Sequence, residues 1–233
     1  MDRTKTLSTP QARMNGLLKN VYLWMTAGLV LTALVAYTIG NNVRLLNQIY
    51  STGTYLFLVL AQLAVVLILS TRLQKMSTSS AILCFILYSI LTGATISSVV
   101  AIYAGAVVSK AFFTTALMFG AMSLYGMSSR RDLSRMGSIF VMALIGIIIA
   151  SLLNFIFKSS ALDFLISLIG VVLFCGITAW DTQKVVSLNN SYGYDMDEDS
   201  YIKLSIICAL ELYLDFINIF LYLVRIFAGS RRD

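Results

Sequence analysis

Seven apolar stretches, each long enough to cross a lipid bilayer as a helix, dominate the 233-residue sequence. The hydrocarbon core of a bilayer requires about 20 apolar residues per helix. The stretches lie at 21–39, 55–71, 81–103, 111–127, 138–157, 162–180 and 202–226. Short connections join them, so we predict an all-α integral membrane protein with seven transmembrane helices. This prediction divides the chain into an N-terminal tail (1–20), a membrane domain (21–227) and a short C-terminal tail (228–233).

The composition excludes most other classes of protein. Only 12% of the residues are charged, about half the fraction in soluble domains. The chain has no histidine, which excludes Ser-His-Asp hydrolysis and His-ligated zinc or haem. Cys84, Cys175 and Cys208 lie far apart inside apolar stretches, without a CxxC motif, and we interpret them as buried apolar residues. We expect a lipid-embedded protein with no enzymatic activity, no tightly bound cofactor and no nucleic-acid partner.

Lysine and arginine are distributed unevenly between the two sets of connections. One set contains Arg3, Lys5, Arg13, Lys19, Arg72, Lys75, Arg130, Arg131, Arg135, Lys184 and Lys203, and the other contains Arg44, Lys110 and Lys158. Because cytoplasmic loops are enriched in these residues, we expect a cytoplasmic N-terminus. Seven crossings then place the C-terminus on the outer side. In an alternative topology, the last stretch returns to the cytoplasm, as its own arginines would favour.

The last apolar stretch carries polar residues at helical spacing. Successive steps of three or four residues place them on one face of a helix. The residues are Cys208, Glu211, Asp215, Asn218, Tyr222 and Arg225. A polar face within a membrane must turn away from lipid, so we expect this helix to pack against the other six.

Glu211 and Asp215 are unfavourable in the middle of a membrane helix, because an ionised carboxylate at the bilayer centre costs roughly 2.5–3.5 kcal/mol of insertion free energy. Protonation, a basic partner or a bound cation would each relieve this cost. Asp181 follows the sixth stretch and is either a solvated helix end or, if the helix continues, a third inward carboxylate. In the second case Asp181 and Asp215 can meet and share one proton, which would make the pair sensitive to pH.

The second apolar stretch (55–71) and the residue after it supply the remaining polar candidates. Arg72 stands at its predicted cytoplasmic end, where it is either a simple topology signal or an ion-pair partner for Asp181 or Asp215. Gln62 lies three turns deeper and is a neutral polar residue that could line a path. Small residues four apart favour close helix packing, and they occur at Gly93 and Ser97, at Ala101 and Gly105, and at Gly146 and Ala150.

Two motifs give the chain a family resemblance. The segments 176–184 (GITAWDTQK) and 209–225 (ALELYLDFINIFLYLVR) resemble the signature of the Bax inhibitor-1 family. The segments 119–126, 131–133 and 142–146 resemble its bacterial branch. The resemblance covers nearly the whole chain, from residue 21 to residue 227.

The resemblance implies a seven-helix fold in which the other six helices wrap the last one. It also implies a pH-responsive calcium leak, in which Asp181 and Asp215 share a proton and Arg72 holds the closed state. A bacterial inner membrane is the implied location, and a membrane-bound protease is an implied partner. The chain departs from some relatives in two places. Its second apolar stretch (55–71) has only Gln62, where they have an acidic residue, and Glu211 adds a carboxylate to the last stretch.

Our main functional prediction is a passive, pH-gated cation pathway that favours Ca²⁺, which prefers several oxygen ligands. Asp181, Asp215 and Glu211 are the candidate ligands, and Glu211, Asn218, Gln62 and Tyr222 are candidates to line the path. The alternative is a non-channel regulator that binds a membrane protease or another membrane protein through the tail at 1–20. A proton-coupled transporter is a weaker third reading, because no inverted repeat or broken helix pair is evident. The glycine-flanked aspartate motif of intramembrane proteases is absent from the sequence.

Overall fold

The computed structural model describes residues 10–51, 53–192 and 197–229. Within these ranges the chain is helical and no strand is present. The helices are α1 (Pro10–Gly40), α2 (Val43–Ser51), α3 (Thr54–Arg72), α4 (Thr78–Ile102), α5 (Gly105–Ser128), α6 (Gly137–Phe157), α7 (Ser160–Tyr192) and α8 (Glu198–Gly229), with short 3-10 turns at η1 (Leu73–Lys75) and η2 (Leu133–Met136). All except α2 and the two 3-10 turns contain an apolar span long enough to cross a membrane, which confirms the predicted fold class.

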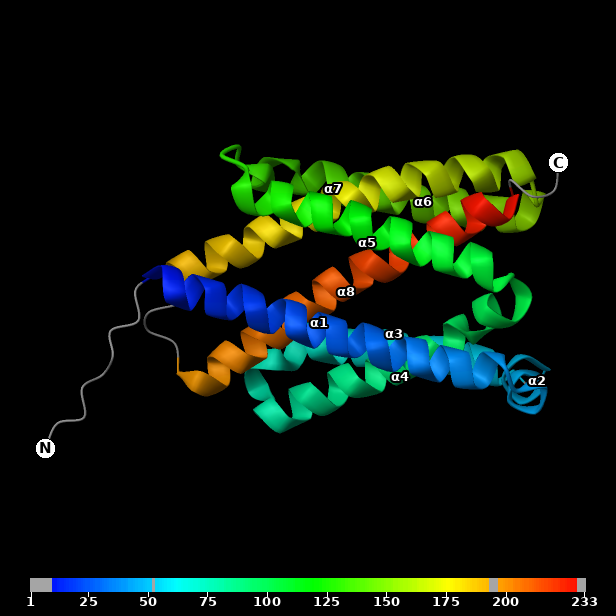
Figure 1. Ribbon diagram of the computed structural model, residues 1–233, viewed down its shortest axis with the longest axis horizontal. Coiled ribbons are helices and arrows are strands. Elements are labelled where there is room, and N and C mark those ends of the chain that lie inside the picture. Colours follow the sequence, from blue (N-terminus) through cyan, green and yellow to red (C-terminus); the bar gives the residue numbers. More distant parts are fainter. Residues whose placement is uncertain (1–9, 52, 193–196, 230–233) are drawn as a thin grey trace, which may run out of the picture.

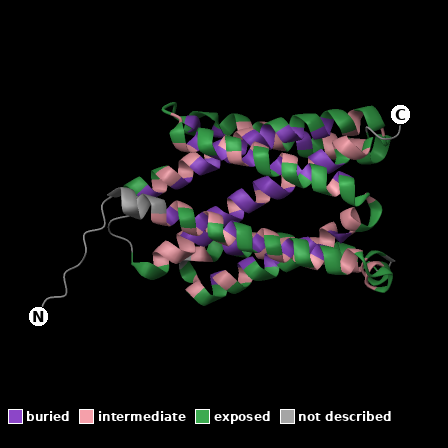
Figure 2. Cartoon of the chain, viewed as in Figure 1, coloured by how far each residue is buried: buried purple, intermediate pink, exposed green. Residues whose placement is uncertain are grey.

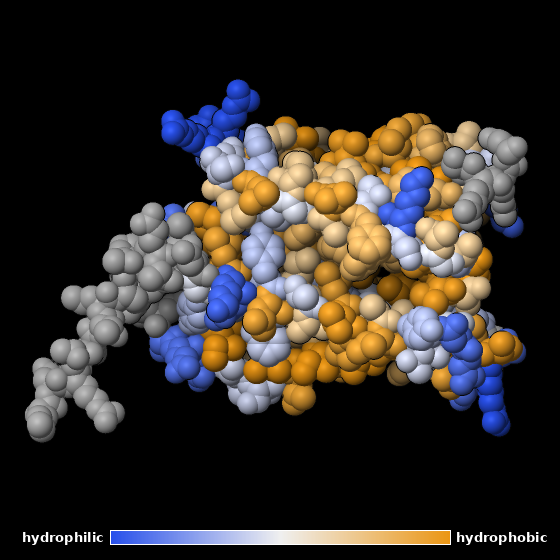
Figure 3. Space-filling model, viewed as in Figure 1, coloured by the Kyte–Doolittle hydropathy of each residue, from blue (hydrophilic) through white to orange (hydrophobic). Residues whose placement is uncertain are grey.

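The seven long helices lie roughly along one axis and alternate in direction (Figure 1). The first described turn of α1 lies at one end of this axis, and the last turn of α8 lies at the other. On the face shown in Figure 3, hydrophilic residues gather mainly near the two ends, and an apolar band separates them. Because α8 is one continuous helix of 32 residues, the structure favours seven crossings over a last segment that turns back.

Helix α8 is the most buried of the seven, with 67% of its most apolar window inside the protein. It packs against α1, α4, α5 and α7, and buried residues follow it through the bundle (Figure 2). Helices α3 and α6 lie further out, where they pack mainly against α4 and α7 respectively. Four of the other six helices therefore surround α8 closely, and two form an outer layer.

A buried polar network ties α8 to α1 and α4. The Thr32 hydroxyl donates to the Ser89 carbonyl oxygen at 2.9 Å, and Tyr213 Oη lies 2.7 Å from the same hydroxyl. Since Thr32 has only one hydroxyl proton, Tyr213 must be the donor in the second bond. The Tyr213 ring also makes edge-to-face contacts with Phe85 and Tyr88. One tyrosine therefore joins three helices at the centre of the bundle.

Replacing Tyr213 with phenylalanine is expected to lower the free energy of unfolding by about 1 kcal/mol, because one buried hydrogen bond is lost. The loss stays small because Thr32 keeps its bond to Ser89. Unfolding in a titration of denaturing detergent measures the change. Tyr125→Phe, at an exposed position of α5, is the matched control and should behave as the wild type. Equal stability of the two variants would contradict the role of Tyr213.

Close approach of α1 and α4 requires a small residue at Gly93. A Cβ atom at this position would lie 2.7 Å from the Thr32 carbonyl oxygen. Ser97, one turn later, is fully buried. By contrast, a Cβ at Gly146 would meet nothing within 4 Å. Ala101 and Gly105 do not share a helix, because α4 ends at Ile102 and α5 begins at Gly105. Of the three predicted pairs of small residues, only the pair at Gly93 and Ser97 therefore lies at a tight helix interface.

One connection differs from the sequence prediction, and the first helix extends beyond the predicted first span. Helix α1 begins at Pro10, within the predicted tail, and residues 1–9 and 230–233 lie outside the described part of the chain. The connection between the first two spans contains α2, which the sequence analysis did not predict. Tyr50 of α2 donates to the Thr95 carbonyl oxygen at 2.7 Å, which fastens α2 to α4. The connection before α8 is described only at residue 197.

Candidate functional site

Asp181 lies inside the bundle because α7 does not end at Trp180, where the sixth apolar stretch of the sequence ends. The helix continues past Trp180 as far as Tyr192, and the Asp181 side chain is buried. Of the two interpretations that the sequence leaves open, the structure supports the continued helix with an inward carboxylate and not the solvated helix end.

One cavity of about 700 Å³ brings together most of the predicted polar residues. Asp181 lines it from α7, and Glu211, Asp215, Asn218 and Tyr222 line it from α8. The opposite wall consists mainly of apolar side chains of α6, including Ile147, Leu152 and Phe155, together with Ser151. We call this space the carboxylate cavity. Its polar residues on α8 extend from Glu211 to Tyr222, or about 16 Å along the helix, which is about half of the hydrocarbon thickness.

Two carboxylate oxygens at this cavity have no protein partner. Glu211 Oε2 and Asp215 Oδ2 are buried and accept no hydrogen bond from the described residues. A buried carboxylate oxygen without a donor is strongly unfavourable, so it calls for a proton or a cation. Asn218, one turn further along, donates through Nδ2 to the Leu214 carbonyl oxygen at 2.8 Å. Unsatisfied acceptors therefore concentrate at Glu211 and Asp215.

Lys184 is the basic residue that pairs with a carboxylate of the site, and the sequence analysis did not identify it in this role. Its Nζ lies 2.6 Å from Glu211 Oε1, with side chains 40% and 30% exposed respectively. The sequence analysis treated Lys184 as one of the loop charges that set the topology. The signal was present nevertheless, because Lys184 follows Asp181 by three residues and lies on the same helical face once α7 continues.

Replacing Lys184 with methionine is expected to lower the free energy of unfolding by about 1–3 kcal/mol, because Glu211 keeps a charge without its partner. Adding Glu211→Gln to this variant removes the charge and should recover most of the loss. Detergent-induced unfolding of the two single variants and the double variant measures this coupling. Simple addition of the two single effects in the double variant would contradict it.

Arg72 and Gln62 do not line the carboxylate cavity. Arg72 is exposed at the end of α3 and forms no ion pair with Asp181 or Asp215. Gln62 donates to Thr92 Oγ1 at 2.9 Å and so joins α3 to α4. The structure therefore pairs Glu211 with Lys184 of α7, while Gln62 belongs to a helix contact elsewhere.

The three predicted calcium ligands share the cavity but do not form a compact cluster. Asp181, Asp215 and Glu211 all line it. Within the described ranges, however, no group of three or more Asp, Glu or Cys side chains is close enough to hold a metal ion together. Their arrangement fits a series of separate carboxylates along a surface better than a preformed calcium cage.

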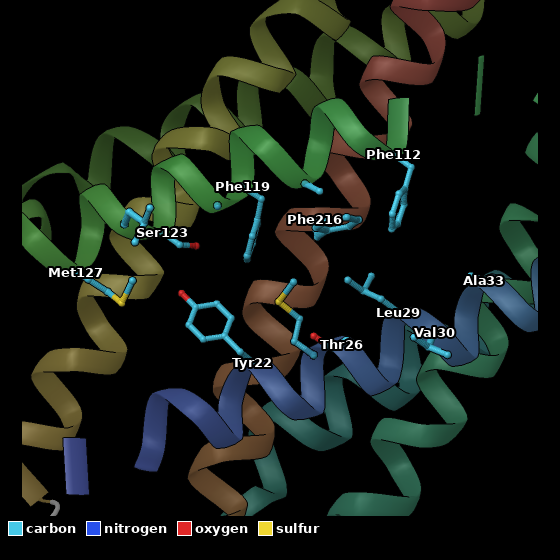
Figure 4. A pocket seen from close by; sticks show the side chains of 14 residues that line it. Tyr22, Thr26, Leu29, Val30, Ala33, Phe112, Phe119, Ser123, Met127 and Phe216 are labelled. Carbon is cyan, nitrogen blue, oxygen red and sulfur yellow. The ribbon is translucent and has the colours of Figure 1, made fainter. Parts of the chain in front are cut away.

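A second cavity of about 530 Å³ lies between α1 and α5, with Phe216 of α8 beside it (Figure 4). Its walls are mostly apolar, and none of the three carboxylates lines it. The buried Tyr22 hydroxyl, which has no hydrogen-bond partner among the described residues, points in the direction of Ser123 in Figure 4. This cavity lacks charged groups, so the carboxylate cavity is the candidate functional site.

At the far end of α8, charged residues are tied to neighbouring elements. Arg225 lies 3.9 Å from Asp163 and 5.6 Å from the centre of the Tyr222 ring. Lys110 of α5 lies 4.3 Å from the centre of the Phe227 ring. These contacts account for Arg225 as a structural residue at the end of the membrane domain.

Comparison with known proteins gives one consistent result. The family model described as "Inhibitor of apoptosis-promoting Bax1" matches residues 14–233. Inner membrane protein YbhL of Escherichia coli strain K12 is 46% identical over 231 residues, which cover 99% of this chain and 98% of that protein. A Rickettsia prowazekii protein, RP147, is 42% identical with full coverage of both chains. YrjE of Lactococcus lactis is 39% identical over 94% of each chain.

Proposed function

The chain belongs to the Bax inhibitor-1 family, and from the carboxylate cavity we propose that it is a passive, pH-sensitive cation leak that conducts calcium. The observation that carries this proposal is the pair of unpartnered oxygens, Glu211 Oε2 and Asp215 Oδ2, at a cavity inside the membrane domain. Such oxygens are stabilised by a proton or by a passing cation, and exchange between these two occupants links conduction to pH.

Asp181 and Asp215 are the proposed pH sensor. Both side chains are buried and line the same cavity from adjacent helices. Two carboxylates in one site of low polarity do not both ionise easily, so they titrate together as a pair. The chain has no histidine, so carboxylates are the groups available for a response near neutral pH. The state of protonation of the pair then sets the negative charge that a cation meets in the cavity.

Calcium is the proposed cargo and not a resident cofactor. It prefers six to eight oxygen ligands in flexible geometry. Asp181, Asp215 and Glu211 provide carboxylates, and Asn218 and Tyr222 add neutral oxygen-bearing groups toward the far end of the cavity. Carboxylates spread along a surface suit passage better than tight binding, because a conducted ion must also leave. Lys184, bonded to Glu211, balances part of the negative charge when no cation is present.

We further propose that the protein lies in a bacterial inner membrane with its N-terminal end in the cytoplasm. The relative YbhL is named as an inner membrane protein. Among the described residues, the basic side chains at the N-terminal end of the bundle include Arg72, Lys75, Arg130, Arg131 and Arg135. The positive-inside rule assigns such an end to the cytoplasm.

Calcium flux into liposomes that contain the purified protein tests the proposal. We expect flux above that of empty liposomes, with a rate that changes across about pH 5 to 8, since a titrating site changes its occupancy by up to about tenfold per pH unit. Absence of flux at every pH, with folded protein confirmed, would contradict the leak. That result would favour the alternative of a regulator that binds a membrane protease or another membrane protein.

A further inference from the structure

A second polar cavity, separate from the carboxylate cavity, lies at the N-terminal end of the bundle. Its volume is about 220 Å³, which gives room for several water molecules. The connection between α5 and α6 contributes Arg130, Arg131, Asp132 and Ser134, and the last turns of α7 contribute Lys184 and Ser187. We call this space the basic pocket. Its lining carries three cations and one carboxylate, and one of the cations, Lys184, forms an ion pair with Glu211 outside the pocket.

Gln183 fixes the geometry of the basic pocket. Its Oε1 accepts a hydrogen bond from the Leu133 backbone N–H at 2.8 Å, and its Nε2 donates to the Arg131 carbonyl oxygen at 2.8 Å. Leu133 is also buried against the bundle. One side chain on α7 therefore holds the backbone on both sides of Asp132. Because Lys184 is the next residue on α7, the same contact fixes the arginine-bearing loop relative to Lys184.

The charges of the pocket favour an anion with several oxygens. Arg130 and Arg131 form no ion pair with any described residue. Asp132 accepts a hydrogen bond from the Ser134 backbone N–H at 3.0 Å, and hydrogen bonds from Ser134 lower the pKa of Asp132, so it stays ionised and occupied with the loop. Guanidinium groups bind phosphate oxygens in pairs, and the Ser187 hydroxyl group can donate to one of the remaining oxygens.

The position of the pocket relative to the membrane supports the same ligand. The membrane spans Gly105–Ser128 and Leu133–Phe157 end and begin on either side of the arginine-bearing loop. The pocket therefore lies near the level at which phospholipid phosphates are found, and basic pockets there bind anionic headgroups. Topology alone explains why arginines occur at this end of the bundle. It does not explain why Gln183 holds their loop against the turn of α7 that carries Lys184.

We propose that the basic pocket binds a phosphate group, supplied either by an anionic phospholipid headgroup or by a soluble phosphate ester. Arg130 and Arg131 provide the paired donors, Lys184 provides a third positive charge, and Ser187 provides a hydroxyl group. Lys184 also bonds Glu211 at the carboxylate cavity. The ligand would therefore contact a residue of the proposed leak. The binding proposal itself is independent of that leak.

Calorimetric titration of the full-length protein in detergent tests this site with two probes: inorganic phosphate, and short-chain phosphatidylglycerol below its micelle concentration. We expect at least one probe to bind the wild type, and the double variant Arg130→Gln, Arg131→Gln to weaken binding about tenfold or more, since charge-assisted hydrogen bonds are lost. Binding of inorganic phosphate identifies a soluble ligand. Binding of phosphatidylglycerol alone identifies a lipid headgroup.

Arg135→Gln is the matched control, because Arg135 is exposed on the same connection but does not line the pocket. We expect this variant to bind within about twofold of the wild type. Failure of both probes to bind the wild type would overturn the proposal. Equal weakening by Arg135→Gln and by the double variant would also overturn it, because that result indicates general surface charge and not a site. Thermal melting of each variant confirms that the protein is folded.

Discussion

Replacing Asp215 with asparagine is expected to abolish the pH dependence of calcium flux. The substitution keeps the size of the side chain but removes the group that titrates. Asp215 is only 3% exposed, lines the carboxylate cavity and has an oxygen without a hydrogen-bond partner. In the proposed mechanism, Asp181 then has no carboxylate at position 215 with which to share a proton. The ratio of flux at the two ends of the pH range should therefore fall to about 1.

Asp163→Asn is the matched control for this experiment. Asp163 is also an aspartate of a membrane helix, but it lies in the first turn of α7, near Arg225, and does not line the carboxylate cavity. This variant should keep the wild-type pH profile. A normal profile in Asp215→Asn would show that the pH sensor lies elsewhere in the chain.

The second large effect is expected from Gly126→Ala, at the contact between α5 and α7. A Cβ atom at Gly126 would overlap the Ala179 carbonyl oxygen and would lie 3.0 Å from the Thr182 Cβ. Backbone cannot move aside as a flexible side chain can, so α5 and α7 must separate. Overpacking of this kind typically lowers the free energy of unfolding by about 1–3 kcal/mol, and we expect the upper part of this range. Because Asp181 lies between Ala179 and Thr182 in sequence, its position should change as well.

Gly120→Ala provides the control on the same helix. A Cβ atom at Gly120 would meet nothing within 4 Å, and alanine favours helix, so this variant should be at least as stable as the wild type. Unfolding of both variants in denaturing detergent measures the difference. If Gly126→Ala were as stable as Gly120→Ala, the close approach of α5 and α7 would not matter for stability.

The helices and the main polar face could be predicted because they depend on local patterns. Apolar stretches of about 20 residues specify membrane spans, and the spacing of Glu211, Asp215 and Asn218 places them on one helical face. The continuation of α7 could not be settled from these patterns, because the apolar stretch ends at Trp180 while the helix continues to Tyr192. Helix α2 was missed for a related reason, because a short amphipathic helix leaves no long apolar stretch.

The basic side chain that pairs with Glu211 was harder to predict. Arg72 and Lys184 are both basic residues at the same end of the bundle, and sequence order gives no reason to choose between them. The choice depends on packing: α7 lies directly against α8, while α3 lies in the outer layer against α4. Small-residue spacing had the same limit, since Gly93 lies at a helix contact and Gly146 does not.

Calcium flux as a function of pH in Asp181→Asn, Asp215→Asn and the double variant tests the central claim most directly. If the two aspartates titrate as one unit, either single substitution should flatten the pH profile, and the double variant should show no further change. A wild-type profile in Asp181→Asn, or separate effects that add in the double variant, would contradict a shared proton at the carboxylate cavity.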